Sequence, residues 1–237
     1  MSKLTSKNVL IVGGSSGIGA ATAKAFASLG ANVTIASRSQ TKLDAATTDI
    51  GASVKTIVLD ATDDAAVEAF FATAEQFDHV VISAAETPSG PARDLPLNDA
   101  YAAMNSKFWG AYRIARLAKI TENGSLTLVS GFLSVRPSKS SVLQGAINAA
   151  LEALARGLAL EFSPVRVNTV SPGLIATPLW SKMDERARSE MFESVAARLP
   201  AKRIGQPEDV ANAVVYLATT PYATGSTVLI DGGGGIA

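Results

Sequence analysis

Short apolar runs alternate along the chain with longer segments that place apolar residues at helical spacing. The first run, residues 8–12, is closed by two glycines, and residues 18–29 then carry small and apolar residues at every third or fourth position until Gly30. Apolar runs of this length predict buried strands, and the 3.6-residue period predicts helices. The chain therefore opens with a strand, a tight turn and a helix.

The same alternation continues to the end of the chain. It predicts further strands at 33–36, 54–59, 79–83, 125–129, 165–170 and 227–230, and helices at about 40–50, 63–74, 98–119, 142–161 and 207–218. Strands that alternate with helices in this way form right-handed βαβ units around a parallel sheet. The polar, Met-containing segment 177–199 fits neither pattern, and we expect it to be a mobile flap. No linker divides residues 1–237, so we predict one α/β domain.

The amino-acid composition of the chain argues against several classes of function. The chain has 21 Lys and Arg against 21 Asp and Glu, so it has no positive field for nucleic acid or an anionic membrane. It has no Cys and one His, His79, which argues against thiol nucleophiles, zinc sites and Ser-His-Asp triads, and no metal is expected. His79 opens a buried strand and is expected to be structural. The first residues lack an apolar signal core, so we expect a soluble, cytoplasmic protein.

A glycine-rich turn joins the first strand to the first helix. It reads Gly-Gly-Ser-Ser-Gly-Ile-Gly over residues 13–19. Glycines let the backbone N–H groups and the helix N-terminus approach a pyrophosphate, whose charge the helix dipole favours. By itself, this turn is also compatible with a simple tight connection between strand and helix.

The spacing G-x-x-x-G-x-G in this turn resembles that of the short-chain dehydrogenase/reductase family. Further motifs that resemble the family follow in its order: 58–63 around an Asp, 171–178 (Ser-Pro-Gly-Leu-Ile-Ala-Thr-Pro), 203–211 and 224–233. The resemblance implies a single Rossmann-type, doubly wound sheet of about seven parallel strands in the order 3-2-1-4-5-6-7. It also implies a nicotinamide dinucleotide across the carboxyl ends of the strands.

The resemblance further implies a small-molecule substrate and a homodimer or homotetramer. Small residues on the two long helices, such as Ala149, Ala150, Ala153 and Gly157, suit close helix packing in such an assembly. The cofactor-binding residues that the family resemblance implies are Gly13, Ser15, Ser16, Gly17, Ile18, Gly19, Asp60, Ala61, Ala84, Ala85, Pro172, Gly173, Ile175 and Thr177.

The end of the second strand indicates which dinucleotide is bound. Sites for NAD usually place an Asp or Glu there to accept the ribose 2′-OH, whereas this chain has Ala-Ser-Arg-Ser at 36–39. Arg38 offers a planar donor fork and Ser37 a hydroxyl, both suited to a 2′-phosphate. NADP(H) is the expected cofactor; the alternative is that Arg38 is an ordinary solvated residue.

The catalytic set that the family resemblance implies is only half present. Asn105 and Ser130 match the Asn and Ser of the Asn-Ser-Tyr-Lys set, but Gln144 stands at the position of the Tyr and Asn148 at that of the Lys. An amide can donate a hydrogen bond but cannot deliver a proton, and it supplies no cation to lower the pKa of a phenol. Ordinary ketone reduction should be badly impaired.

Two functions remain open at this stage. The first is an NADP(H)-dependent oxidoreductase whose substrate needs little acid help, such as an imine, a conjugated system or an activated carbonyl, with Ser130 and Gln144 as hydrogen-bond donors. Asn105 or Glu86 would then manage protons, since a carboxyl beside an apolar pocket can have a raised pKa; Glu86 can equally be a solvated loop residue. The second is an NADP(H)-binding sensor or assembly subunit without turnover.

Overall fold

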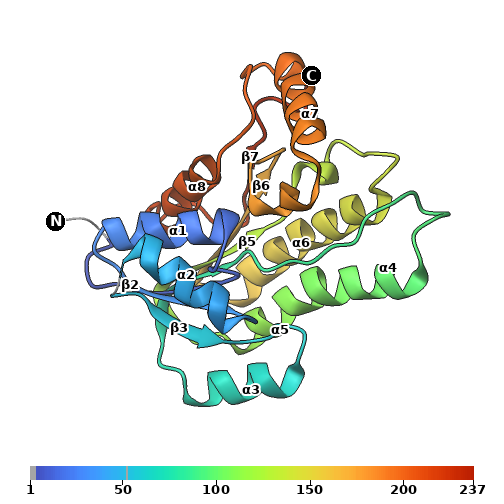
Figure 1. Ribbon diagram of the computed structural model, residues 1–237. Coiled ribbons are helices and arrows are strands. Elements are labelled where there is room, and N and C mark those ends of the chain that lie inside the picture. The colour runs from blue at the N-terminus through green and yellow to red at the C-terminus, as the bar shows by residue number, and fades with distance from the viewer. Residues whose placement is uncertain (1–3, 52) are drawn as a thin grey trace.

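The computed structural model describes residues 4–51 and 53–237. Within these residues the sheet has seven parallel strands, in the order β3-β2-β1-β4-β5-β6-β7 (Figure 1). This confirms the predicted fold class and strand order. The strands are β1 (Asn8–Val12), β2 (Asn32–Ser37), β3 (Lys55–Val58), β4 (Phe77–Ile82), β5 (Ile120–Val129), β6 (Arg166–Pro172) and β7 (Thr227–Ile230).

Most helices follow the predicted ranges closely; the exceptions are the segments 98–119 and 177–199. They are α1 (Gly17–Ser28), α2 (Gln40–Ile50), α3 (Asp64–Thr73), α4 (Leu97–Met104), α5 (Gly110–Leu117), α6 (Val142–Glu161), α7 (Glu185–Arg198) and α8 (Pro207–Thr219). Two short 3₁₀ helices, η2 (Phe132–Ser134) and η3 (Pro178–Lys182), and a π-helical turn, η1 (Asn105–Trp109), complete the helical elements. Asp63 is the N-cap of α3, where its side chain accepts a hydrogen bond from the N–H of Ala66.

Alternation of side chains along each strand divides the core into two layers. Val9 and Ile11 of β1 pack on the side of α1, α2 and α8, whereas Leu10 and Val12 pack on the side of α3, α5 and α6. Successive side chains of a strand point to opposite faces, so a strand buried on both faces is apolar throughout. Figure 1 shows the resulting three layers, with α1 beside α8 on one face of the sheet and α3 to α6 on the other.

Two segments differ in detail from their sequence predictions. The helix expected at 98–119 is interrupted by the π-helical turn η1, which separates α4 from α5. The segment 177–199, which showed no readable pattern, contains η3 and α7, and Asp184 caps α7 by accepting from the N–H of Ala187. Whether this segment moves stays a prediction.

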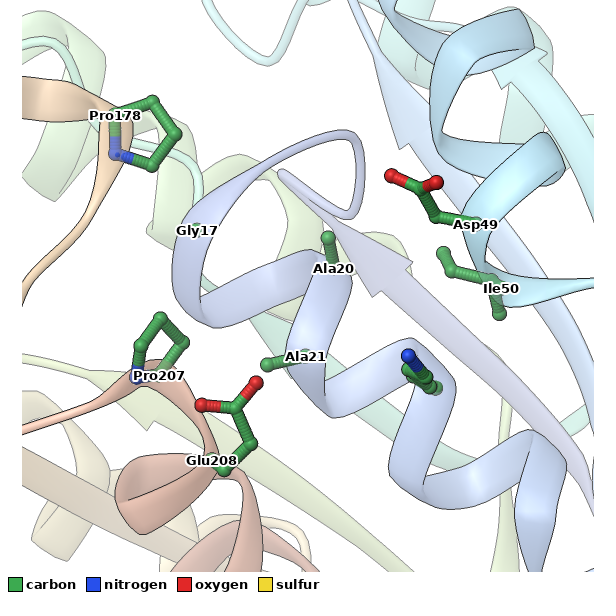
Figure 2. Close-up of a pocket in the computed structure, with 9 residues that line it drawn as sticks. Gly17, Ala20, Ala21, Asp49, Ile50, Pro178, Pro207 and Glu208 are labelled. Atoms are coloured by element: carbon green, nitrogen blue, oxygen red, sulfur yellow. The ribbon is translucent and has the colours of Figure 1, made fainter. Parts of the chain in front are cut away.

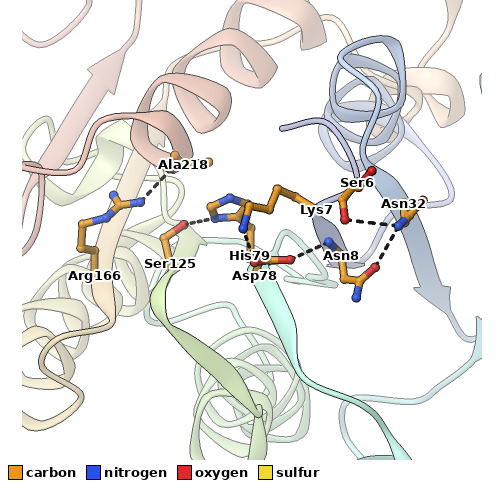
Figure 3. Close-up of polar contacts among 9 residues, drawn as sticks. All are labelled: Ser6, Lys7, Asn8, Asn32, Asp78, His79, Ser125, Arg166 and Ala218. Atoms are coloured by element: carbon orange, nitrogen blue, oxygen red, sulfur yellow. Dashed lines mark hydrogen bonds and ion pairs between the residues drawn. The ribbon is translucent and has the colours of Figure 1, made fainter. Parts of the chain in front are cut away.

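A polar cluster supports the amino-terminal end of the central strands. His79 is buried, and its Nδ1 lies 2.9 Å from Ser125 Oγ (Figure 3). Burial lowers the pKa of His79 to about 4, so its ring is neutral at pH 7. Lys7 and the N–H of Asn8 both donate to Asp78, while Arg166 donates to carbonyl groups in the last turn of α8. His79 therefore has the structural surroundings expected for it.

No helix in residues 4–51 and 53–237 is long and apolar enough to cross a membrane.

Candidate active site

The glycine turn after β1 is packed too closely for other residues. Gly13 has a φ of +88°, and a Cβ there would lie 2.5 Å from the backbone N of Ala84; Gly17 has a φ of +53°. A Cβ on Gly19 would collide with the carbonyl oxygen of Gly13. Because these positions require glycine, the turn leaves bare backbone at the carboxyl end of β1 and holds it against the segment after β4.

The N-terminus of α1 fits a phosphate group. Its N-cap, Ser16, makes no side-chain capping bond, and its first turn carries no acidic residue. The first N–H groups of a helix have no partner within the helix, and they favour an anion together with the helix dipole. A Cβ on Gly17 would lie 3.3 Å from Thr177, so the start of η3 flanks this cradle. The sequence-predicted residues of the turn are thus assembled in a form that fits a dinucleotide.

Arg38 is not free, because it pairs with Glu86. Its Nη2 lies 2.7 Å from Glu86 Oε2, and both side chains are largely exposed. The hydrogen bond from Arg38 lowers the pKa of Glu86, which contradicts the raised pKa suggested for Glu86. Ser37, the neighbouring candidate, accepts a hydrogen bond from Ser15 at 2.9 Å. Any anion held by Arg38 must therefore compete with a carboxylate.

The remaining cofactor candidates lie in turns that follow the strands. Asp60 accepts hydrogen bonds from the N–H and the hydroxyl of Thr62 through Oδ1. Ile175 is buried and pairs with Gly205, and its carbonyl accepts the indole N–H of Trp180 at 2.9 Å. These contacts fix the turns after β3 and β6. Ala61, Ala84, Ala85, Pro172 and Gly173 belong to the same set of strand ends.

A buried lysine, Lys107, contacts two of the predicted catalytic residues. Lys107 Nζ donates to the carbonyl of Ser130 and to Asn148 Oδ1, both at 2.7 Å. Burial lowers the pKa of Lys107 to about 8, against the opposing attraction of Glu152. The cation absent from position 148 is thus present in the site, but it comes from η1.

Glu152 is the second residue that the sequence analysis missed. Ser130 Oγ donates to Glu152 Oε1 at 2.9 Å, and Ser134 Oγ donates to the same oxygen at 2.7 Å. Glu152 lies four residues after Asn148 and eight after Gln144, so the three share one face of α6. That spacing is a signal by which the sequence could have revealed Glu152. Lys107 had no such signal, because its direction depends on the π-helical turn.

The structure brings together some of the predicted catalytic residues. Ser130 and Asn148 are linked through Lys107, whereas Gln144 donates to the hydroxyl of Thr87 at 3.1 Å. Asn105 is half-buried at the first position of η1.

A cleft on the outer side of α1 is a separate feature. It has a volume of about 300 Å³ and lies between α1, the end of α2 and the starts of η3 and α8 (Figure 2). Gly17 and Pro178 border it, but none of the predicted catalytic residues lines it. We do not assign the substrate to this cleft.

Comparison with known proteins finds similarity along nearly the whole chain. Residues 12–234 match the family model described as enoyl-(acyl carrier protein) reductase. The chain is 31% identical to the short-chain dehydrogenase/reductase ucsE of Acremonium sp, over 99% of this chain and 97% of that protein.

Two similar solved structures hold a nucleotide. A small-chain dehydrogenase in complex with NADPH is 32% identical, with a TM-score of 0.83 over 98% of this chain and 100% of the other. L-Sorbose reductase from Gluconobacter frateurii, complexed with NADPH and L-sorbose, is 26% identical, with a TM-score of 0.89 over 99% of this chain and 98% of the other.

Proposed function

Since the chain belongs to the short-chain dehydrogenase/reductase family, we propose that it is an NADP(H)-dependent oxidoreductase with an unusual small-molecule substrate. The observation that carries this proposal is the bare backbone cradle of Gly13, Gly17 and Gly19 at the uncapped N-terminus of α1. When bound, the reduced nicotinamide supplies a hydride. The chain itself has to bind and orient the two molecules and to manage the proton.

The end of β2 supports NADP(H) over NAD(H). Arg38 follows β2, where NAD sites usually carry a carboxylate, and its guanidinium can pair with a 2′-phosphate. The two similar structures described above contain NADPH. Glu86 opposes this preference, because its carboxylate occupies Arg38 and would repel a phosphate placed there.

The lack of a tyrosine at position 144 restricts the substrate. A positioned general acid typically contributes about 10²–10⁴-fold to the rate, and the Gln144 amide cannot supply that proton. An imine that enters as its iminium ion already carries the proton that a ketone would need. A conjugated or activated carbonyl needs less help from an acid than a simple ketone does. These classes are therefore the proposed substrates.

A binding titration tests the cofactor. By nucleotide fluorescence, NADPH should bind about tenfold or more tightly than NADH, the effect expected of one charge-assisted contact. Arg38→Asp should remove or invert this preference, and Glu86→Gln should strengthen NADPH binding alone. Arg156→Asp, on the exposed side of α6, is the matched control. Equal affinities for the two nucleotides in the wild-type protein would contradict the NADP(H) assignment.

A turnover screen tests the reaction. NADPH oxidation would be followed with 2-methyl-1-pyrroline as the imine, cyclohex-2-enone as the conjugated system and hexane-2,3-dione as the activated carbonyl. We expect the imine or the dione to be reduced and a simple ketone, cyclohexanone, to be much slower. Tight NADPH binding with no turnover of any probe would instead favour a cofactor-binding protein without catalysis.

A further inference from the structure

The ion pair between Arg38 and Glu86 spans the carboxyl end of β1. In the sheet, β1 lies between β2 and β4, so residues that follow β2 and β4 flank the glycine turn on its two sides. Arg38 directly follows β2, and Glu86 lies in the segment after β4. That segment is packed against the turn, since a Cβ on Gly13 would lie 2.5 Å from the backbone N of Ala84. The pair therefore joins the two sides of the dinucleotide cradle.

Glu86 lies among several cations. The hydrogen bond and the charge of Arg38 lower the pKa of Glu86 most, and the charges of Lys182 in η3 and Lys42 in α2 add to this effect. The acidic group that faces Arg38 besides Glu86 is Asp60, after β3. A phosphate monoester carries a charge of about −1.5 to −2 at pH 7 and forms strong bonds with a guanidinium. The Glu86 carboxylate thus occupies surroundings that suit a phosphate.

The same segment is bound at the other half of the candidate site. The N–H of Glu86 donates to Ser106 Oγ in η1 at 2.8 Å, and Gln144 Nε2 donates to Thr87 Oγ1 at 3.1 Å. Gln144 stands where the family resemblance implies the catalytic Tyr. We call residues 86–87 the strap, because they link Arg38 at the nucleotide end of the site to Gln144 at the predicted substrate end.

The bond between the strap and Arg38 is weak enough to be replaced. The side chains of Arg38 and Glu86 are 57% and 63% exposed, and an exposed ion pair typically changes an equilibrium by no more than about fivefold. A 2′-phosphate is a stronger partner for Arg38 than one carboxylate is. A ribose 2′-OH carries no charge, so it does not compete with Glu86 for the guanidinium.

We propose that Glu86 is a specificity-determining residue: it leaves Arg38 when a 2′-phosphate binds there, and this release of the strap frees Gln144 from Thr87 for the substrate. The inference rests on the proposed function. Glu86 lowers the affinity for NADP(H), but it makes the release of Gln144 depend on the 2′-phosphate. With NAD(H), the strap stays on Arg38, and Gln144 stays bound to Thr87.

The first test measures binding of two nucleotide fragments by calorimetry. Adenosine 2′,5′-bisphosphate carries the 2′-phosphate, and AMP lacks it. Glu86→Gln should tighten binding of the bisphosphate about three- to fivefold and leave AMP unchanged. In an Arg38→Met background, Glu86→Gln should change neither affinity, because the two residues act as a pair. Asp94→Asn, an exposed carboxylate later in the same connection, is the matched control and should resemble wild type.

A general repulsion by Glu86 would give a different result. Glu86→Gln would then tighten bisphosphate binding equally with and without Arg38. That result would overturn the proposal, and so would an unchanged bisphosphate affinity in Glu86→Gln.

The second test follows Gln144 itself. Its side-chain amide gives ¹⁵N–¹H NMR signals, identified by their loss in Gln144→Leu, and Thr87→Val supplies the signals of the amide without its strap contact. The bisphosphate should move the wild-type signals toward those of Thr87→Val, and AMP should not. The bisphosphate has no nicotinamide, so it acts on Gln144 through the strap. In Arg38→Met, it should leave the signals in place. Identical Gln144 signals with the bisphosphate and with AMP would overturn the coupling.

Neither test requires turnover, so their outcomes are separate from that of the proposed function. A wild-type protein that reduces none of the probes contradicts the proposed function, while the affinities and the Gln144 signals still decide the inference. Reduction of a probe by NADPH, together with Gln144 signals that the bisphosphate does not move, would leave the proposed function standing and overturn the strap.

Discussion

Two largely buried polar clusters lie at opposite ends of the same central strands. The amino-end cluster contains Asp78, His79, Ser125 and Arg166, and the carboxyl-end cluster contains Lys107, Ser130, Asn148 and Glu152. β5 carries Ser125 near its middle, and Ser130 follows its end. Both clusters have burial in common, but their charges are compensated differently.

At the amino end, each charged group meets a fixed partner. Asp78 forms an ion pair with Lys7 at 2.9 Å, Arg166 binds carbonyl groups that end α8, and His79 is held neutral by burial (Figure 3). At the carboxyl end, Lys107 and Glu152 are both buried but contact neutral groups instead of each other. The first arrangement stabilises the fold, whereas the second buries a lysine and a glutamate, without an ion pair between them, at the carboxyl ends of the strands.

The largest expected effect lies at the amino end. Arg166→Ala removes the donor of the carbonyl groups of Leu217, Ala218 and Ala223, which close α8 and the turn after it. The carbonyl of Ala223 keeps the side chain of Asn168 as a donor, so the substitution leaves two carbonyls, those of Leu217 and Ala218, without this partner. Each buried carbonyl left without a partner costs about 1–3 kcal/mol, so the free energy of unfolding should fall by about 4 kcal/mol. Urea unfolding would measure this loss.

NADPH affinity should be unchanged in Arg166→Ala, since Arg166 lies at the other end of β6 from the predicted nucleotide contacts. Arg166→Lys, which keeps one donor, should lose less stability. A change in NADPH affinity without loss of stability would show that the two ends of the sheet are not separable.

His79 should make stability depend on mildly acidic pH. Burial lowers its pKa from 6.5 to about 4, so between these values the unfolded chain binds a proton that the folded protein does not. Stability should therefore fall as the pH drops from 6.5 to 4, by at most about 3 kcal/mol for this group. The difference in unfolding free energy between wild type and His79→Gln, measured across this range, isolates the effect. Parallel pH curves for the two proteins would contradict a buried neutral histidine.

Lys107 should show the corresponding effect at alkaline pH. Burial lowers its pKa from 10.5 to about 8, so between these values the unfolded chain again holds the extra proton. Its contribution should raise stability as the pH increases from 8 to 10.5, by up to about 3 kcal/mol, and Lys107→Met should lack this rise. The exposed Lys55→Met provides the comparison. If the unfolding free energies of wild type and Lys107→Met change identically between pH 8 and 10.5, the buried, charged state of Lys107 would be contradicted.

The sequence predicted the fold far better than the candidate site. Strand order and the bounds of α6 followed from periodicity and from the family resemblance, because every residue of an element contributes to that pattern. The site depends on single side chains. The inward direction of Lys107 depends on the π-helical turn η1, and the pairing of Arg38 with Glu86 joins two strand ends that are far apart in sequence. Neither the direction of Lys107 nor the Arg38–Glu86 pair produces a periodic pattern in the sequence.

The smallest expected effect is that of a substitution in α6, the helix that carries Asn148 and Glu152. It tests whether the two clusters, and not the stability of α6, determine how the free energy of unfolding depends on pH. Gly157 is exposed within α6, and a Cβ there would meet nothing within 4 Å. Gly157→Ala should raise the unfolding free energy by about 0.5–1 kcal/mol, because glycine loses more backbone freedom than alanine on folding. Both pH windows should be unchanged, since Gly157 lies in neither cluster.

If Gly157 faces a second copy of the chain, as its small size suggested, the added methyl group would instead weaken assembly, which sedimentation at several protein concentrations would detect. A shift of the alkaline window in Gly157→Ala would show that the stability of α6, and not the burial of Lys107, governs the carboxyl-end cluster.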